Sequence, residues 1–306
     1  MDSRIQAIVG EIKKSIKGKD DIISKVLCAM FAGGHILLED IPGVGKTTLA
    51  MAISQSMSLS YRRVQFTPDV MPSDITGFNM YNNQSQQFEF HEGAAMCNLL
   101  LADEINRTSP KTQSALLELM EEGKVTVDGQ TRFVPKPFIV IATQNPFGSA
   151  GTQKLPESQV DRFMVRLSMG YPNHSSSLEI LRQDSVPETI VPIISADQFL
   201  AMQNEVSAVH VDDAIYEMIV NITEATRSSE NIQLGLSPRG SKALLRMAKS
   251  HAFMNERSFV NTEDVLANLS CIMTHRLVLS ARAKAKNIDT DAVLEKIADD
   301  IYMPKI

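Results

Sequence analysis

Residues 39–48 hold the side chains whose types and spacing point most directly to a chemical task. One residue separates Gly43 from Gly45, and Lys46 and Thr47 follow directly. Glycines so placed let the backbone fold back, and successive N–H groups then point inward at an anion. The lysine can reach the β- and γ-phosphates of a nucleotide, and the threonine hydroxyl can ligate Mg²⁺. The pattern predicts a phosphate-binding loop made of Pro42, Gly43, Val44, Gly45, Lys46, Thr47 and Thr48.

This loop departs from the usual G-x-x-x-x-G-K-[ST] pattern at its first position, where Asp40 stands in place of glycine. Taken alone, the motif also fits a glycine–proline turn that happens to precede a lysine. The flanking sequence favours the phosphate loop, because a short apolar strand candidate over 35–38 precedes it and a helical pattern begins near Thr47. Strand, loop and helix in this order form the P-loop of nucleotide-binding proteins.

An acidic pair, Asp103 and Glu104, follows the apolar run 98–102. Open α/β sheets bind their ligands at the carboxyl ends of their strands. There Asp103 can hold Mg²⁺, directly or through water, and Glu104 can orient and deprotonate an attacking water. The alternative is a solvated acidic pair, and the phosphate loop upstream favours the catalytic interpretation.

Three further polar residues are candidates for the same chemistry. Asn145 follows the apolar run 138–143, and its amide can hydrogen-bond a γ-phosphate or a water, although Asn-Pro is also ordinary turn chemistry. Arg162 is either a surface ion-pair partner of Asp161 or a cation delivered to the γ-phosphate of a neighbouring subunit. Arg239 falls in the first turn of a predicted helix, where a cation opposes the helix dipole. It is either solvated or reaches the ATP phosphates from a lid.

These residues need a scaffold to bring them together. Short apolar segments separated by helical patterns predict a parallel sheet with helices on both faces. The five predicted strands cover 36–38, 61–66, 98–102, 138–143 and 163–167. The fold class is therefore an α/β P-loop core with a five-stranded parallel sheet.

Two segments, 78–90 and 124–134, have the alternation and turn residues of β-hairpins inserted into this core. The apolar residues of the first hairpin are expected to pack against the sheet, with contact to a client protein as the alternative. They are Phe78, Tyr81, Phe88 and Phe90.

The pattern changes near residue 171. Pro172, Pro187 and Pro192 indicate a linker, and the segments beyond it have helical periodicity. We therefore predict a nucleotide-binding core over 1–172, a linker over 173–192 and an all-α lid domain over 193–306.

The composition is that of an ordinary soluble chain. Of the 306 residues, 43% are hydrophobic and 22% are charged, which suffices for a buried core. The formal net charge of −6 is opposite to the basic footprint of a nucleic-acid binder. No apolar run approaches the roughly 18 residues of a membrane span, and the first residues lack a signal-peptide core, so we expect a cytoplasmic protein. Three widely spaced cysteines predict neither a disulfide frame nor a metal site.

Taken together and in this order, the motifs resemble the MoxR family of AAA+ ATPases. The resemblance covers nearly the whole chain, and it is specific because the motifs occur in combination. Besides the phosphate loop, the matching segments are LLADEINR (100–107), PKTQSALLE (110–118), ATQNP (142–146), LPESQVDRF (155–163) and SPR (237–239). The resemblance implies an ATPase core with a helical lid, and a homo-oligomeric ring that is typically hexameric.

The same resemblance implies residue roles and partners. Lys46 and Thr47 match the Walker A motif, and Asp103 and Glu104 match Walker B. Asn145 matches sensor 1, while Arg162 matches the arginine finger and Arg239 matches sensor 2. The implied cofactors are ATP and Mg²⁺. The implied function is ATP-driven, chaperone-like remodelling or maturation of a client protein, together with a partner that carries a von Willebrand factor A domain.

Two other functions fit parts of the sequence. In a nucleotide-gated binding scaffold, ATP sets the shape or the oligomeric state and hydrolysis only resets it; Lys46 and Glu104 serve both readings. A DNA-acting ATPase would carry basic hairpin tips, whereas the tips here are 82–85 and Asp128-Gly129 and contain no basic residue. The net charge also disfavours it, so no nucleic-acid partner is expected.

Overall fold

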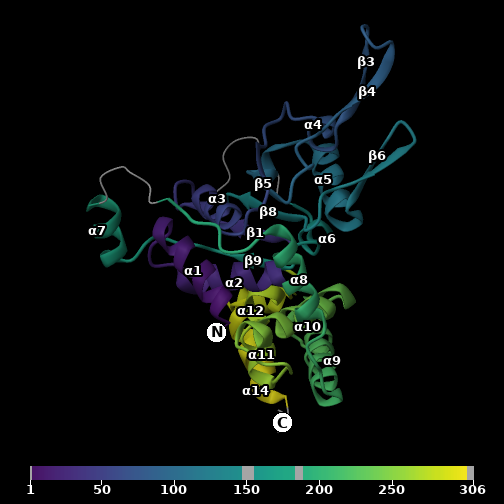
Figure 1. Cartoon of the computed structure of the whole chain (residues 1–306). Helices are drawn as coiled ribbons and strands as arrows, with labels where there is room; N and C mark the ends of the chain where they lie inside the picture. The colour runs from purple at the N-terminus through teal and green to yellow at the C-terminus, as the bar shows by residue number, and fades with distance from the viewer. Residues whose placement is uncertain (1, 147–154, 183–188, 302–306) are drawn as a thin grey trace.

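A five-stranded parallel sheet forms the centre of the molecule in the computed structural model, which describes residues 2–146, 155–182 and 189–301 (Figure 1). Its strand order is β2-β5-β8-β1-β9. The strands are β1 (Ile36–Glu39), β2 (Tyr61–Gln65), β5 (Leu99–Asp103), β8 (Ile139–Gln144) and β9 (Val165–Leu167). The predicted five-stranded parallel sheet is confirmed. The central strands are almost wholly buried, as expected for uninterrupted apolar runs in a parallel sheet.

The strand order decides which loops become neighbours. β1 and β5 both pair with β8, with Leu37 opposite Ala142 and Leu100 opposite Val140. All three strands run in the same direction, so their carboxyl ends lie along one edge of the sheet. The residues that follow these strands are therefore brought side by side, although they are far apart in the sequence.

Alternate side chains of the strands enter two hydrophobic clusters, one on each face of the sheet. Leu38 and Ile141 lie in the cluster beneath α1 (Ser3–Ser15), α2 (Asp20–Phe31) and α3 (Lys46–Ser56), and this cluster continues into the lid. Leu37 and Val140 lie in the cluster beneath α4 (Pro72–Thr76) and α5 (Pro110–Glu122). Two short elements, η1 (Ile105–Arg107) and α6 (Glu157–Val160), complete the core.

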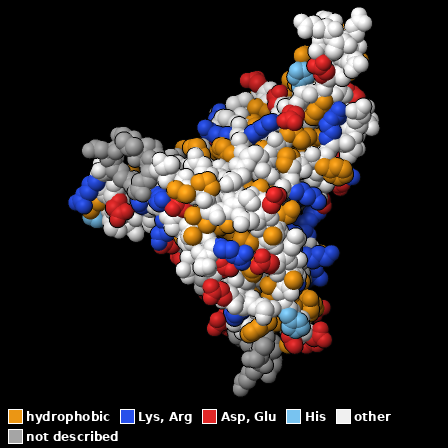
Figure 2. Space-filling view, viewed as in Figure 1, with side chains coloured by type: hydrophobic (Ala, Val, Ile, Leu, Met, Phe, Trp, Pro, Cys, Tyr) orange, Lys and Arg blue, Asp and Glu red, His pale blue; other side chains and the backbone are white. Residues whose placement is uncertain are grey.

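Both predicted hairpins are present and project from the body of the molecule (Figure 1). They consist of β3 (Phe78–Asn82) with β4 (Gln87–His91), and β6 (Lys124–Val127) with β7 (Gln130–Phe133). In Figure 2 the tip of the β3–β4 hairpin shows neither charged nor hydrophobic side chains. The two hairpins contact each other, because the Asn79 amide donates to Asp128 at 2.8 Å.

The expectation that the first hairpin packs its aromatic residues against the sheet is wrong. Tyr81 and Phe88 are 48% and 72% exposed, and their rings contact each other instead, with centroids 5.4 Å apart. Phe78 is also exposed and stacks on His91 of the paired strand. Phe90 lies against the guanidinium of Arg132, a residue of the second hairpin. In a hairpin that stands away from the core, these aromatic residues contact one another, the paired strand and the second hairpin instead of the sheet.

The lid domain is built mainly from helices that lie on the opposite side of α2 from the sheet (Figure 1). The helices are α8 (Ala196–Ser207), α9 (Asp213–Ser228), α10 (Pro238–Met254), α11 (Thr262–Leu266), α12 (Leu269–Met273), α13 (Ala281–Ala285) and α14 (Thr290–Asp300). One feature adds to the predicted all-α lid: β10 (Ile232–Leu234) pairs with β11 (Val278–Leu279) in a short antiparallel ribbon. This pairing satisfies backbone groups between helices, which hydrophobic periodicity does not reveal.

A helix, α7 (His174–Arg182), lies within the predicted linker 173–192. The Asn173 side chain begins it by accepting a hydrogen bond from the Ser176 N–H at 2.8 Å. Residues 183–188 of the linker, which include Pro187, lie outside the described residues. None of the described helices is long and apolar enough to cross a membrane.

Candidate nucleotide-binding site

The predicted phosphate loop connects β1 to α3. Gly43 and Gly45 have φ angles of +85° and +94°, in a region that side-chain-bearing residues rarely adopt. Gly45 caps α3, so the unpaired N–H groups of the first helical turn begin at Lys46 and face the end of the sheet. Strand, loop and helix therefore follow one another as the glycine spacing predicted.

A cavity of about 400 Å³ opens above this loop at the carboxyl edge of the sheet. It brings the loop together with three residues that the sequence placed on other strands: Asp103, Glu104 and Asn145. Of the loop residues, Val44 does not line the cavity, and its side chain packs against the hydrophobic cluster beneath α1 and α3. The full lining is Asp40, Pro42, Gly43, Gly45, Lys46, Thr47, Thr48, Arg63, Gln65, Asp103, Glu104, Thr143, Gln144 and Asn145.

The Lys46 ammonium is held by the loop itself. Its Nζ donates to the carbonyl oxygens of Asp40 and Ile41, each at 2.8 Å. Partial burial lowers the pKa of Lys46, and the nearby carboxylates of Asp40 and Asp103 act in the opposite direction. The Lys46 ammonium thus lies at the cavity, held by two carbonyl oxygens of its own loop. An incoming phosphate can replace these carbonyl partners.

Both oxygens of the Asp103 carboxylate have partners. The Thr143 hydroxyl donates to Oδ1 at 2.6 Å, and Arg63 pairs with Oδ2 at 2.7 Å. The Thr143 hydroxyl also accepts the backbone N–H of Glu104 at 2.9 Å, so one threonine of β8 holds both Asp103, which ends β5, and Glu104, which follows it. Because this hydroxyl accepts one hydrogen bond and donates another, it sets the orientation of both acidic residues.

Glu104 has a left-handed backbone conformation, with φ +56°, which is uncommon for a residue with a side chain. Two groups donate to Oε2 of its carboxylate, the Gln65 amide at 2.9 Å and Arg107 at 2.6 Å. The strained backbone turns the side chain into the cavity instead of along the strand. Such outliers concentrate at functional sites.

Sequence reasoning missed Arg63, Gln65 and Thr143. Arg63 and Gln65 lie on β2, and Thr143 lies on β8, the two strands that flank β5. Their one signal in the sequence is a polar side chain in or at the end of an apolar run. Only the strand order shows that these positions face Asp103 and Glu104.

Asp40, the departure from the usual loop pattern, is buried and joins the loop to the segment after β9. Its Oδ2 accepts from the Gly170 N–H at 3.0 Å and from the Ser168 hydroxyl at 3.1 Å, and also from the Met169 N–H. A glycine at this position cannot make these bonds. Asp40 therefore fixes the first residue of the loop to the chain that leaves the sheet.

The predicted magnesium ligands fit a metal that arrives with its nucleotide. Among the described residues, no group of three or more His, Cys, Asp or Glu side chains is arranged to hold a metal ion. Mg²⁺ commonly takes only one or two protein ligands and completes its shell with phosphates and water. Thr47 and Asp103 line the same cavity and suit that demand, provided that Arg63 releases the carboxylate.

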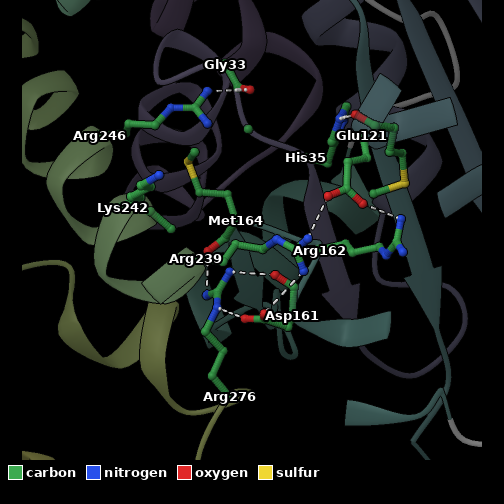
Figure 3. Close-up of a pocket in the computed structure, with 13 residues that line it drawn as sticks. Gly33, His35, Glu121, Asp161, Arg162, Met164, Arg239, Lys242, Arg246 and Arg276 are labelled. Atoms are coloured by element: carbon green, nitrogen blue, oxygen red, sulfur yellow. Dashed lines mark hydrogen bonds and ion pairs between the residues drawn. The ribbon is translucent and has the colours of Figure 1, made fainter. Parts of the chain in front are cut away.

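Arg162 and Arg239 do not line this cavity; they line a second one, of about 300 Å³, between the core and the lid (Figure 3). Arg239 lies in the first turn of α10, after the N-cap Ser237, as predicted. Both guanidinium groups point at the carboxylate of Glu121, which pairs with Arg162 at 2.6 Å and with Arg239 at 2.6 Å. The structure therefore brings these two residues together and separates them from the phosphate loop. We call this second cavity the arginine cavity.

Asp161 forms its ion pairs with arginines of the lid and not with its neighbour Arg162. Its carboxylate pairs with Arg276 at 2.7 Å and with Arg239 at 3.4 Å (Figure 3). Arg276 is buried and also donates to the Phe163 carbonyl at 2.6 Å. These contacts attach the lid to the segment before β9.

His35 backs the arginine cavity and is neutral. Its Nδ1 accepts the Val140 N–H at 3.0 Å, so the proton is on Nε2, which donates to the Met120 carbonyl at 3.0 Å. Removal of the ring from water lowers the pKa of His35 to about 4, and the positive charge of Arg246 acts in the same direction. The ring joins β8 to the end of α5, one residue before Glu121.

Comparison with known proteins finds a matching protein family for both the core and the lid. A family model described as the ATPase family associated with various cellular activities (AAA) matches residues 35–165, and one for the AAA lid domain matches residues 224–297. The uncharacterized protein YeaC of Bacillus subtilis is 46% identical over 97% of this chain and 93% of its own length. Chaperone MoxR1 of Mycobacterium tuberculosis is 34% identical over 99% of this chain and 83% of its own.

A solved structure is similar over nearly the whole chain. The crystal structure of an ATPase candidate from Cytophaga hutchinsonii superposes with a TM-score of 0.91. It is 35% identical in sequence, and the match covers 99% of this chain and 95% of that one. The core, the lid and their arrangement thus recur together in a homologous protein.

Proposed function

Because the chain belongs to the MoxR family of AAA+ ATPases, we propose that it binds ATP with Mg²⁺ above the phosphate loop and hydrolyses it there. The observation that carries this proposal is the convergence on one cavity of Lys46, at the start of α3, with Asp103 and Glu104, at the end of β5. An ammonium group, a metal-binding carboxylate and a second carboxylate that can activate water together suit phosphoryl transfer to water.

Each group of the cavity has a proposed task. The loop N–H groups and Lys46 bind the phosphates, and Thr47 and Asp103 hold the metal. Bound Mg²⁺ neutralises charge on the β- and γ-phosphates. Glu104 accepts the proton of the attacking water, and Asn145 holds that water or the γ-phosphate in position. Glu104 is suited to this because Gln65 and Arg107 fix its carboxylate.

The arginine cavity supports a further step of the proposal. Arg162 and Arg239 are absent from the lining of the phosphate-loop cavity, yet they share one acidic partner. We propose that Arg162 acts on the ATP of a neighbouring copy in a homo-oligomeric, hexameric ring. For Arg239, which the sequence predicted to reach ATP phosphates from the lid, we propose the role of a second cation for the same neighbouring phosphates.

For the work that hydrolysis drives, we propose chaperone-like remodelling or maturation of a client protein in the cytoplasm, with a von Willebrand factor A domain protein as partner. One relative is named a chaperone, and the exposed aromatic residues of the β3–β4 hairpin are suited to contact with another protein. The alternative is a nucleotide-gated scaffold. It predicts that a non-hydrolysable ATP analogue alone supports maturation of the client, whereas a remodelling motor requires turnover.

The experiment that tests hydrolysis is the variant Glu104→Gln. It should retain ATP binding with Mg²⁺, because the loop is intact, while turnover falls by about 10²–10⁴-fold. Nucleotide binding is followed by isothermal titration calorimetry, and turnover by phosphate release. The control is Glu230→Gln, which changes an exposed glutamate of the lid and should leave both unchanged. Full turnover in Glu104→Gln would remove Glu104 from this role, and an absence of ATP binding by the unaltered protein would end the proposal.

A further inference from the structure

Glu121 occupies a position in the arginine cavity that the proposed function does not explain. Its two carboxylate oxygens are divided between Arg162 of the core and Arg239 of the lid, each at 2.6 Å (Figure 3). The three side chains are between 32% and 46% exposed. The contact is therefore a clasp between core and lid that faces solvent and that a dissolved anion can reach.

Neither Glu121 nor Arg239 is placed where its own helix favours it. Glu121 lies in the last turn of α5, where the helix dipole disfavours an acid, and α5 has no basic residue in that turn. Arg239 lies in the first turn of α10, where the dipole disfavours a cation. Helix stability alone thus argues against both residues, and surface ion pairs of this exposure contribute little to folding. The pair of Glu121 with Arg239 is better explained by the position in which it holds the Arg239 guanidinium.

The charges around the clasp favour an anion. Five basic side chains line the cavity against two acidic ones, Asp161 and Glu121; the basic ones are Arg162, Arg239, Lys242, Arg246 and Arg276. Asp161 pairs with buried Arg276 at 2.7 Å and with Arg239 only at 3.4 Å, so Glu121 is the closer acid that both Arg162 and Arg239 must leave. Arg162 also donates to the Leu117 carbonyl at 2.9 Å, a bond that keeps it beside α5 when the carboxylate is gone.

We propose that Glu121 is a positioning residue that holds Arg162 and Arg239 together in the separate protomer and yields both to the polyphosphate of the neighbouring copy's ATP. This inference rests on the proposed function. The Glu121 carboxylate takes the place of the phosphate until a neighbour supplies one. Its release then also loosens the clasp between α5 and α10, so that nucleotide on one copy acts on the lid of the next.

The test uses the full chain with Lys46→Ala, which disables the phosphate loop, and inorganic tripolyphosphate as the probe. In that background Glu121→Gln should bind tripolyphosphate about three- to tenfold more tightly in isothermal titration calorimetry. The competing carboxylate is then neutral, and losing two exposed ion pairs changes binding by that order. Adding Arg162→Ala and Arg239→Ala should abolish the gain.

The matched control is Glu122→Gln. It removes the same charge one residue away, where the side chain pairs with Lys124 at 3.3 Å and does not line the arginine cavity. Tighter binding in Glu121→Gln but not in Glu122→Gln supports the proposal. Equal binding in the two variants, or weaker binding in Glu121→Gln, would overturn it.

A second measurement separates this inference from the proposed function. With Lys46 intact, Glu121→Gln should lower by several-fold the protein concentration at which ATP turnover is half-maximal, because the arginines are free to meet a neighbour. An unchanged or higher concentration contradicts the role of Glu121. If the unaltered chain hydrolyses no ATP at any concentration, the proposed function fails, and the tripolyphosphate comparison still decides whether Glu121 competes with phosphate.

Discussion

The phosphate-loop cavity and the arginine cavity both contain groups that suit a triphosphate, but they are built in different ways. The first is formed by the ends of adjacent parallel strands and one helix N-terminus, all within the core. The second joins the ends of α5 and α6 to the start of α10, so it spans core and lid. The described linings of the two cavities have no residue in common.

This difference shows how much each site must change before it can act. In the phosphate-loop cavity, Thr143, Gln65 and Arg107 orient the two carboxylates, and Asp103 would have to release Arg63 to hold a metal. In the arginine cavity, Arg162 and Arg239 both pair with Glu121, and Arg239 also pairs with Asp161. The first site must therefore give up one ion pair, whereas the second must release two arginines from acids of the same chain.

The largest effect that separates the two regions should come from Arg162→Ala. Turnover should fall by about 10³–10⁵-fold, as for other arginines that stabilise phosphoryl transfer from a neighbouring subunit. ATP binding should be unchanged, because Arg162 lies outside the phosphate-loop cavity. Phosphate release and calorimetry measure the two quantities.

Mixtures of two inactive variants provide the control for this prediction. Lys46→Ala subunits bind no phosphate at their own loop but keep Arg162, so together with Arg162→Ala subunits they should restore part of the turnover. Inactive mixtures would contradict action on a neighbour.

Acid should lower the stability of the fold through His35, which lines the arginine cavity. Its pKa is about 4 in the folded chain and about 6.5 in the unfolded chain, so the unfolded chain binds more protons between these values. The stability from neutral His35 is therefore present above pH 6.5 and is lost as the pH falls towards 4, by about 3 kcal/mol at most. Burial and Arg276 also hold the pKa of His275 well below its ordinary value, which adds to the same slope.

The measurement is the free energy of urea unfolding at several pH values between 7.5 and 4. His35→Gln removes the titrating ring and should flatten the slope, even if it lowers stability at pH 7.5. An equal slope in this variant would show that other groups cause the acid sensitivity. The described lining of the phosphate-loop cavity contains no histidine. An acid sensitivity that disappears in His35→Gln can therefore be assigned to the arginine cavity.

A smaller effect should follow from Asp40→Gly, which restores the usual first residue of the loop motif. The buried N–H group of Met169 and the partly buried N–H group of Gly170 would lose their carboxylate acceptor, at a cost of about 1–3 kcal/mol in the free energy of unfolding. Ser168→Ala removes only one donor, from an exposed hydroxyl, and should cost less. Equal stability of Asp40→Gly and the unaltered chain in urea titrations would contradict this anchoring role.

The smallest effect is expected at the hairpin that belongs to neither cavity. Phe88→Ser replaces a side chain that is 72% exposed, so the free energy of unfolding should change by less than about 0.5–1 kcal/mol. ATP turnover should be unchanged. A loss of turnover as large as that of Arg162→Ala would connect the hairpin to the chemistry and contradict the assignment of catalysis to the two cavities.

Much of the fold was predictable because its signals are local. Continuous apolar runs indicated buried parallel strands, and the glycines at 43 and 45 indicated a loop in which the backbone folds back, which the structure forms with positive φ angles at both glycines. The aromatic residues of the β3–β4 hairpin were misplaced, because alternation predicts a hairpin but not whether anything covers it. The β10–β11 ribbon was missed since each strand is too short to show a pattern.

The sequence by itself determined the phosphate loop, the acidic pair and their order along the chain, because glycine conformations and strand ends depend on adjacent residues. Only the tertiary structure decided which cation meets which acid. Glu121 and Arg239 are 118 positions apart, and Asp40 and Met169 are 129 apart. Such contacts depend on the strand order and on how the lid packs against the core, which no local spacing specifies.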